Sequence, residues 1–168
     1  MGQVITALGR PSVTPSAGRG QLFRSRGFDA IVRMVRGPLL QTVIDDQPAA
    51  ILDCGTGVHG LGAEFLRREI KHATVLMSHT HWDHIQGLPF FPPIYLPHCR
   101  MRILGFEGAR RGLVNVLTGQ MESPYFPVPF GELPGNIEVE ELKDLDFKVG
   151  PVRVRAWFSN HPGICVGY

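Results

Sequence analysis

The sequence predicts an α/β fold, and three neighbouring segments in the first half of the chain carry this prediction. Residues 49–52 form an apolar run that enters a glycine-bearing turn, as expected where a buried strand ends. Leu61, Phe65 and Ile70 then recur at the spacing of one helical face. Residues 74–77 form a second apolar run, too continuous for a strand with one exposed face. A strand, a helix and a strand within about 30 residues predict a βαβ unit with parallel strands.

The residues before this unit give weaker signals. Residues 1–36 mix Gly, Pro, Ser and Arg without sustained periodicity, which is typical of a loop or a weakly ordered segment. Short apolar runs at 31–35 and 39–44 are compatible with the strands of a first hairpin. We therefore expect a poorly ordered or divergent N-terminal segment at 1–36 and one domain at 37–168.

The residues after the unit alternate proline-rich loops with short regular elements. The expected elements are loops at 89–97 and 124–134, a strand at 101–106, a helix with Leu113, Val114, Leu117 and Met121 on one face, and half-exposed strands at 137–142 and 152–158. The last of these strands leads directly to His161.

Composition limits the class of protein. A chain of 168 residues with 43% hydrophobic and 19% charged residues has the balance of one globular domain. The formal charge of +2 is too small to indicate a polyanionic partner, although nucleic acid is not excluded because arginines are frequent near the N-terminus. The three cysteines are widely spaced without a CxxC pair, which favours a reducing, cytoplasmic setting over a disulfide framework. No apolar run is long enough to span a bilayer, so we expect no membrane partner.

The densest chemical signal is the run HTHWDH at residues 79–84, in which four of six residues are able to bind a divalent metal. Side chains two apart on an extended backbone point the same way, so His79 and His81 are placed to bind one ion. A turn at Trp82 would direct Asp83 and His84 toward a second ion about 3.5–4 Å away, the separation at which two metals share a water. Nitrogen ligands with a carboxylate favour zinc, with iron or manganese as alternatives.

These residues also carry a family resemblance. The segment SHTHWDHIQGLPFF resembles the signature motif of the metallo-β-lactamase superfamily, and ILDCGTG resembles the aspartate-bearing turn that precedes it there. The segments GQMESPYFPVPF and SNHPGICVGY are similar to one bacterial branch, described as metal-dependent hydrolases or phosphodiesterases and related to class II cyclic-nucleotide phosphodiesterases and the tRNA 3′-processing endonuclease. The likeness extends from around residue 49 to the end of the sequence.

The resemblance implies a ligand set and a fold. It assigns His79, His81 and His161 to a first metal ion and Asp83 with His84 to a second. If the site hydrolyses an ester, we expect Asp83 also to orient the attacking water. The resemblance assigns Asp53 a supporting contact with the loop that carries the motif histidines, residues 79–84. The implied fold is a four-layer αββα sandwich, which we expect to be truncated because the family continues to a bridging aspartate and a final histidine.

The function expected from these features is hydrolysis of a phosphodiester or related ester by a zinc-bound hydroxide. The expected substrate is a small-molecule or nucleotide-type ester, and a homodimer remains open. Hydrolysis of a lactam, lactone or thioester is the neighbouring alternative. The alternative from another class is an inactive metal-binding fragment or a non-catalytic regulatory module.

Other candidate residues favour structural roles. We expect His59 and His72 to be solvated, the pair His98 and Cys99 not to form a metal site, and Cys54 to be a small buried hydrophobe. Aromatic residues near the motif have two interpretations, the mouth of a substrate site or the core, and the core is more common. They are Phe90, Phe91, Tyr125 and Phe126.

Overall fold

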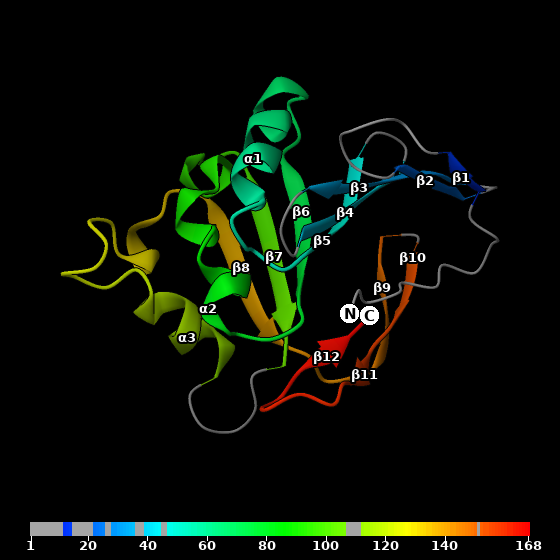
Figure 1. Cartoon of the computed structure of the whole chain (residues 1–168). Helices are drawn as coiled ribbons and strands as arrows, with labels where there is room; N and C mark the ends of the chain where they lie inside the picture. Colours follow the sequence, from blue (N-terminus) through cyan, green and yellow to red (C-terminus); the bar gives the residue numbers. More distant parts are fainter. Residues whose placement is uncertain are drawn as a thin grey trace.

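The computed structural model contains one large mixed sheet with helices on one face (Figure 1). It describes residues 50–106, 112–150 and 152–168 in full, and the backbone of five strands within residues 12–49. The eight strands of the sheet lie in sequence order. The first five pair antiparallel and the last four pair parallel, so the fifth strand has one antiparallel and one parallel neighbour. They are β1 (Ser12–Thr14), β2 (Leu22–Ser25), β3 (Phe28–Val35), β4 (Leu39–Ile44), β5 (Gln47–Leu52), β6 (His72–Met77), β7 (Arg100–Gly105) and β8 (Asn136–Glu141). The prediction of a mixed α/β fold is confirmed.

The predicted βαβ unit is present as β5, helix α1 (Val58–Arg67) and β6. The other helical elements are α2 (Trp82–Ile85), η1 (Leu88–Phe90), η2 (Pro92–Tyr95), α3 (Leu113–Gly119) and η3 (Phe130–Glu132). The two proline-rich segments predicted as loops therefore contain short 3₁₀ turns. The fixed φ of proline suits the first turn of η1 and η2, where no backbone N–H is needed.

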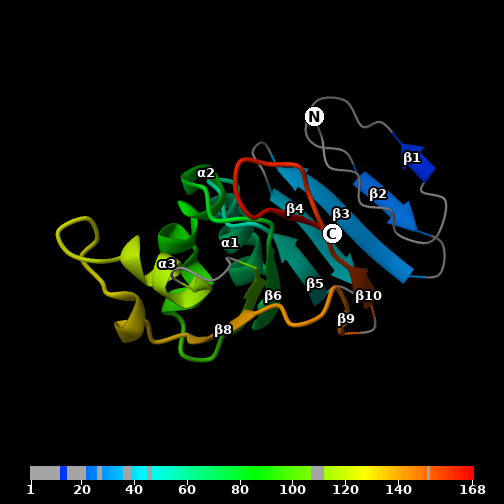
Figure 2. The same ribbon diagram turned by 90° about the horizontal axis from the view of Figure 1, so that it is seen from below.

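Two small antiparallel hairpins lie on the other face of the large sheet, where Figure 1 labels all four of their strands and Figure 2 labels β9 and β10. One pairs β9 (Asp146–Val149) with β10 (Val152–Arg155), and the other pairs β11 (Trp157–Phe158) with β12 (Val166–Gly167). The strand predicted at 152–158 is thus divided at Ala156, whose side chain is buried. Neither β9 nor β12 was predicted, because strands of four and two residues are too short for a recognisable pattern of their own.

Apolar side chains pack on both faces of the parallel strands. Val75 and Ile103 belong to the cluster under the helices, whereas Leu76 and Leu104 belong to a second cluster that includes Val149 of β9. Burial of each such side chain stabilises the fold by about 1.5–3 kcal/mol. Coverage on both faces explains why residues 74–77 form a continuous apolar run rather than an alternating one.

The N-terminal half of the large sheet corrects one prediction. Apart from a candidate strand at 31–35, residues 1–36 were expected to be a loop or weakly ordered segment, yet β1 and β2 also lie within this range. The expected hairpin is present, since β3 pairs antiparallel with β4. Successive antiparallel pairing supplies backbone hydrogen bonds that the composition of a single segment does not reveal. The remaining residues of 1–36 lie outside the described part of the chain.

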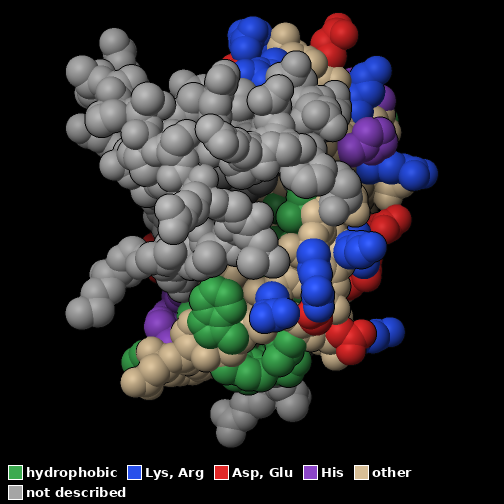
Figure 3. Space-filling view, turned by 90° about the vertical axis from the view of Figure 1, so that its right-hand side faces the viewer, with side chains coloured by type: hydrophobic (Ala, Val, Ile, Leu, Met, Phe, Trp, Pro, Cys, Tyr) green, Lys and Arg blue, Asp and Glu red, His purple; other side chains and the backbone are tan. Residues whose placement is uncertain are grey.

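The surface of the described residues is mixed in charge. Figure 3 shows lysine and arginine side chains interspersed with acidic ones, and hydrophobic side chains gathered near the lower edge of that view. Several of the cations are paired, for example Arg102 with Glu140 and Arg153 with Asp146. Within the described ranges, no helix has both the length and the apolar character needed to cross a membrane.

Candidate metal centre

The candidate site lies where β5 and β6 end. Leu52 and Leu76 are register partners in parallel strands, so the residues that follow them emerge at the same edge of the sheet. Asp53 follows β5, and Ser78 and His79 follow β6. The one-turn helix α2 then brings Asp83 and His84 back to the same edge.

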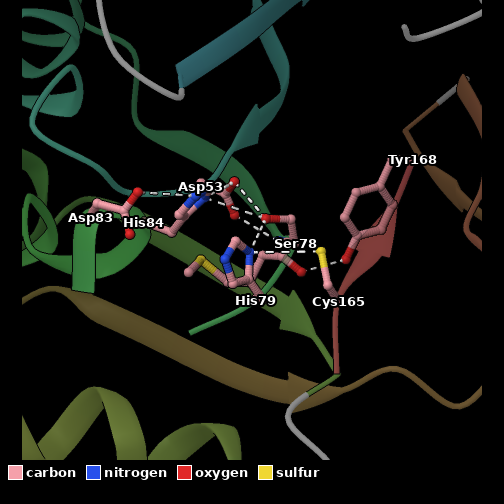
Figure 4. Close-up of polar contacts among 8 residues, drawn as sticks. Asp53, Ser78, His79, Asp83, His84, Cys165 and Tyr168 are labelled. Carbon is pink, nitrogen blue, oxygen red and sulfur yellow. Dashed lines mark hydrogen bonds and ion pairs between the residues drawn. The ribbon is translucent and has the colours of Figure 1, made fainter. Parts of the chain in front are cut away.

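Asp53 is a buried carboxylate at the base of the site (Figure 4). Its Oδ1 accepts a hydrogen bond from the backbone N–H of Ser78 at 2.6 Å, and its Oδ2 accepts one from the Ser78 hydroxyl at 2.7 Å. Nδ1 of His84 donates to the same Oδ2 at 2.7 Å. The φ angle of Asp53 is 58°, a left-handed conformation that turns its side chain back toward β6 and that Asp tolerates better than most residues. Asp53 therefore contacts the segment that carries the histidines through Ser78 and His84.

Three histidines converge above this carboxylate. One ligand atom from each of His79, His81 and His161 lies within 4.8 Å of the others. The ring centroids of His79 and His81 are 4.8 Å apart, and that of His161 lies 4.5 Å from His79. Imidazoles packed at this distance around a common point are a suitable donor set for a divalent metal such as zinc, which takes three histidines and leaves one position open.

Contacts with β6 hold the segment that carries His161 in place. The backbone N–H of Val166 donates to the carbonyl oxygen of Ser78 at 2.8 Å, and the Tyr168 hydroxyl donates to that of Met77 at 2.8 Å. Sγ of Cys165 lies 3.8 Å from Nδ1 of His79. His161 therefore approaches His79 because β12 and its flanking residues pack against the end of β6.

His161 supplies an independent test of whether a metal fits. Its Nδ1 is buried and has no hydrogen-bond partner among the described residues. A buried ring nitrogen without a partner is unfavourable unless something binds there or water reaches it. The residues present therefore fit a metal on grounds of geometry and of unsatisfied polar atoms.

Asp83 and His84 lie beside the three histidines but outside that group. Oδ2 of Asp83 is 3.4 Å from Nε2 of His84, and the His84 ring centroid is 4.0 Å from that of His79. The Asp83 side chain is 67% exposed. The arrangement leaves Nε2 of His84 and the Asp83 carboxylate facing one another at the solvent side, as a second half-site would require.

The electrostatics favour a neutral His79. Burial lowers the pKa of His79 to about 4, with the neighbouring His84 acting in the same direction and Asp53 opposing it. The pKa of His84 is raised, chiefly by its hydrogen bond to Asp53 and against the effect of burial. Near neutral pH, His79 is therefore unprotonated, which is the form that binds metal.

Two contact residues were not identified from the sequence. Ser78 precedes the motif, and its position at the end of a buried strand beside a histidine is a signal that points to a hydrogen-bonding role. Cys165 gives no local signal, because its contact with His79 depends on how β12 packs. Among the residues expected to be structural, Cys54 is fully buried, Cys99 is buried, and His59, His72 and His98 are exposed.

The aromatic residues near the motif divide between the core and the surface. Phe91 is fully buried in the cluster under the helices. Phe90 and Tyr125 are largely exposed, and Phe90 makes an edge-to-face contact with Phe126. The core interpretation therefore holds for Phe91 but not for Phe90 or Tyr125.

Comparisons with known proteins add no family. No family model matches the chain, and no curated protein matches it.

Proposed function

We propose that this chain is a metal-dependent hydrolase of phosphodiester or related ester bonds, built on the four-layer αββα fold of the metallo-β-lactamase superfamily. The observation that carries the proposal is the approach of His161 to His79 and His81, with ligand atoms within 4.8 Å of one another. These donors come from two segments far apart in the sequence, and their convergence supports a metal-binding role for the HTHWDH run. The hairpins opposite the helical layer support the proposed architecture.

The proposed roles follow from the donor atoms. A zinc ion held by His79, His81 and His161 would lower the pKa of a water molecule and polarise the ester to be cleaved. The low pKa of His79 keeps its ring nitrogen available for binding at neutral pH. The exposed Asp83 carboxylate is able to accept a hydrogen bond from an attacking water and so to orient it. With Asp83, His84 offers a place for a second ion, for which zinc is proposed and iron or manganese are alternatives.

A second candidate is a metal-binding module without catalysis. The position of Asp83 favours it, because its carboxylate lies outside the group of three histidines and is largely exposed. Such a module would retain the metal but would turn over no substrate.

One set of measurements separates the two candidates. The purified chain is assayed for bound metal and for cleavage of bis(p-nitrophenyl) phosphate, together with His81→Ala and a control, His72→Ala. His72 is exposed at the start of β6, at the opposite end of that strand. A hydrolase binds metal and cleaves the phosphodiester, and His81→Ala loses both while His72→Ala keeps both. Metal binding with no cleavage of phosphodiester, ester, lactam or thioester substrates supports the module, and a folded chain that binds no metal contradicts both candidates.

A further inference from the structure

Ser78 connects the buried carboxylate to a candidate ligand. Its hydroxyl oxygen lies 2.7 Å from Oδ2 of Asp53 and 2.9 Å from Nδ1 of His79 (Figure 4). Ser78 is only 3% exposed, so water has little access to compete for these two contacts. The three groups form a continuous chain of hydrogen bonds beneath the site.

The direction of this chain follows from counting hydrogens. An ionised carboxylate only accepts hydrogen bonds, and a hydroxyl has one hydrogen to donate. The Ser78 hydrogen therefore points to Asp53, which leaves the Ser78 oxygen to accept from His79. In the reverse arrangement, two oxygens 2.7 Å apart would face each other without a hydrogen between them. Nδ1 of His79 consequently carries the hydrogen, and Nε2 of the neutral ring keeps its lone pair.

The same carboxylate orients a second histidine directly. Oδ2 of Asp53 accepts from Nδ1 of His84 at 2.7 Å, so His84 also has its hydrogen on Nδ1. Its Nε2 then faces the Asp83 carboxylate at 3.4 Å. Asp53 reaches His84 without an intermediary but reaches His79 only through Ser78.

We propose that Ser78 is a positioning residue. Its hydroxyl donates to Asp53 and accepts the hydrogen on Nδ1 of His79, and it thereby fixes the His79 tautomer whose Nε2 is free to bind metal. The use of that nitrogen as a ligand rests on the proposed function. The tautomer itself is a property of the metal-free protein and is tested without any metal.

The direct test is the tautomer of His79 in the metal-free chain. Long-range ¹H–¹⁵N correlation spectra recorded at about pH 8, where ordinary imidazoles are neutral, distinguish hydrogen on Nδ1 from hydrogen on Nε2. The variants His79→Gln and His84→Gln assign the signals by their loss. We expect hydrogen on Nδ1 of His79 in the wild type and in Ser78→Thr, which keeps a hydroxyl, and a shift toward Nε2 in Ser78→Ala. Hydrogen on Nε2 in the wild type, or no change in Ser78→Ala, overturns the proposal.

Metal affinity supplies the second measurement. Groups that orient a metal-binding histidine typically contribute 10- to 100-fold to affinity, so Ser78→Ala should bind zinc at least about tenfold more weakly in chelator competition. Ser78→Thr should remain within about threefold of the wild type. Thr74→Ala is the matched control, because it removes a hydroxyl from β6, the strand that Ser78 follows, and should leave the affinity unchanged.

The outcomes separate this proposal from the proposed function. A wild-type chain that binds no zinc contradicts the metal site, while the spectra still decide the tautomer. A wild type that binds zinc, with Ser78→Ala binding it equally well, overturns the role of Ser78 and leaves the metal site standing. If Ser78→Ala fails to fold, the wild-type spectrum alone decides whether Nδ1 of His79 carries the hydrogen.

Discussion

The backbone N–H of Val166 donates a hydrogen bond to the carbonyl oxygen of Ser78 at 2.8 Å, which joins the segment carrying His161 to the residues that follow β6, among them His79. Val166 is fully buried, so this bond is shielded from water. The candidate metal centre therefore depends on a contact between two segments that lie far apart in the sequence. In this position, the buried Nδ1 of His161 has no hydrogen-bond partner among the described residues.

Substitution of His161 should affect metal binding far more than folding. We expect His161→Ala to lower zinc affinity by about 100-fold or more, because one of three proposed ligands is lost. The metal-free variant should unfold at a denaturant concentration close to that of the wild type, since the imidazole forms no hydrogen bond through Nδ1. Chelator competition and urea unfolding measure the two effects. His98→Ala, at an exposed site, should change neither, and unchanged zinc affinity in His161→Ala would contradict the assignment.

Loss of the Asp53 charge should destabilise the metal-free protein. Asp53→Asn replaces an acceptor of three hydrogen bonds by a group that accepts through only one oxygen. We expect the free energy of unfolding to fall by about 2–3 kcal/mol, as measured by urea denaturation. Asn is the appropriate replacement because it tolerates the φ of 58° at this position, whereas Ala would add backbone strain. Asp144→Asn, at an exposed position, serves as the control and should have little effect; equal stability of both variants would show that the Asp53 network contributes nothing.

The sequence predicted the elements whose signal is local. The βαβ unit was found from apolar runs and helical spacing, because both faces of β6 are covered and its pattern is unambiguous. The HTHWDH run identified the candidate ligands near β6 for the same reason, since neighbours in sequence remain neighbours at a strand end. Asp53 and His161 were assigned mainly from the resemblance, because nothing in their own segments specifies what they approach.

The parts that were not predicted depend on pairing between distant segments. Strands β1 and β2 are formed by successive antiparallel pairing, which their composition does not disclose. The contact of Cys165 with His79 exists only because β12 packs against the end of β6. Ser78 is an intermediate case, since its hydroxyl acquires a role only when Asp53 adopts a left-handed backbone that turns it inward.

Two histidines with opposite pKa shifts predict a maximum in the stability of the metal-free protein near pH 6.5. Burial lowers the pKa of His79 from 6.5 to about 4, so between these values the unfolded chain binds more protons than the folded one. Stability should therefore fall by about 2–3 kcal/mol as the pH is lowered through this window. The raised pKa of His84 has the opposite sign: its contribution is present below pH 6.5 and is lost as the pH rises through the folded-state value.

Urea unfolding of the metal-free chain at about pH 4.5, 6.5 and 8 measures this profile. His79→Gln is the informative variant, because it should remove most of the decline on the acid side. Glu64 titrates lower, since its hydrogen bond to Arg67 holds its pKa at about 2, so it contributes little at pH 4.5. An acid decline that is the same in His79→Gln and the wild type would contradict the buried, neutral state of His79.

The packing of α2 on the turn at residues 53–55 predicts that alanine at two glycines changes stability in opposite directions. A Cβ at Gly87 would overlap the backbone carbonyl of Gly55, and the Gly87 N–H donates to the Cys54 carbonyl at 2.8 Å, so no side chain is available to move aside. Gly87→Ala should therefore destabilise the fold by at least about 2 kcal/mol and weaken zinc binding, because it pushes α2 away from the turn. Gly60→Ala lies within α1 with nothing within 4 Å of its Cβ, and it should stabilise by about 0.5–1 kcal/mol without changing zinc affinity. Thermal unfolding of both variants decides the matter, and a Gly87→Ala chain as stable as the wild type would show that the turn and α2 are not in contact.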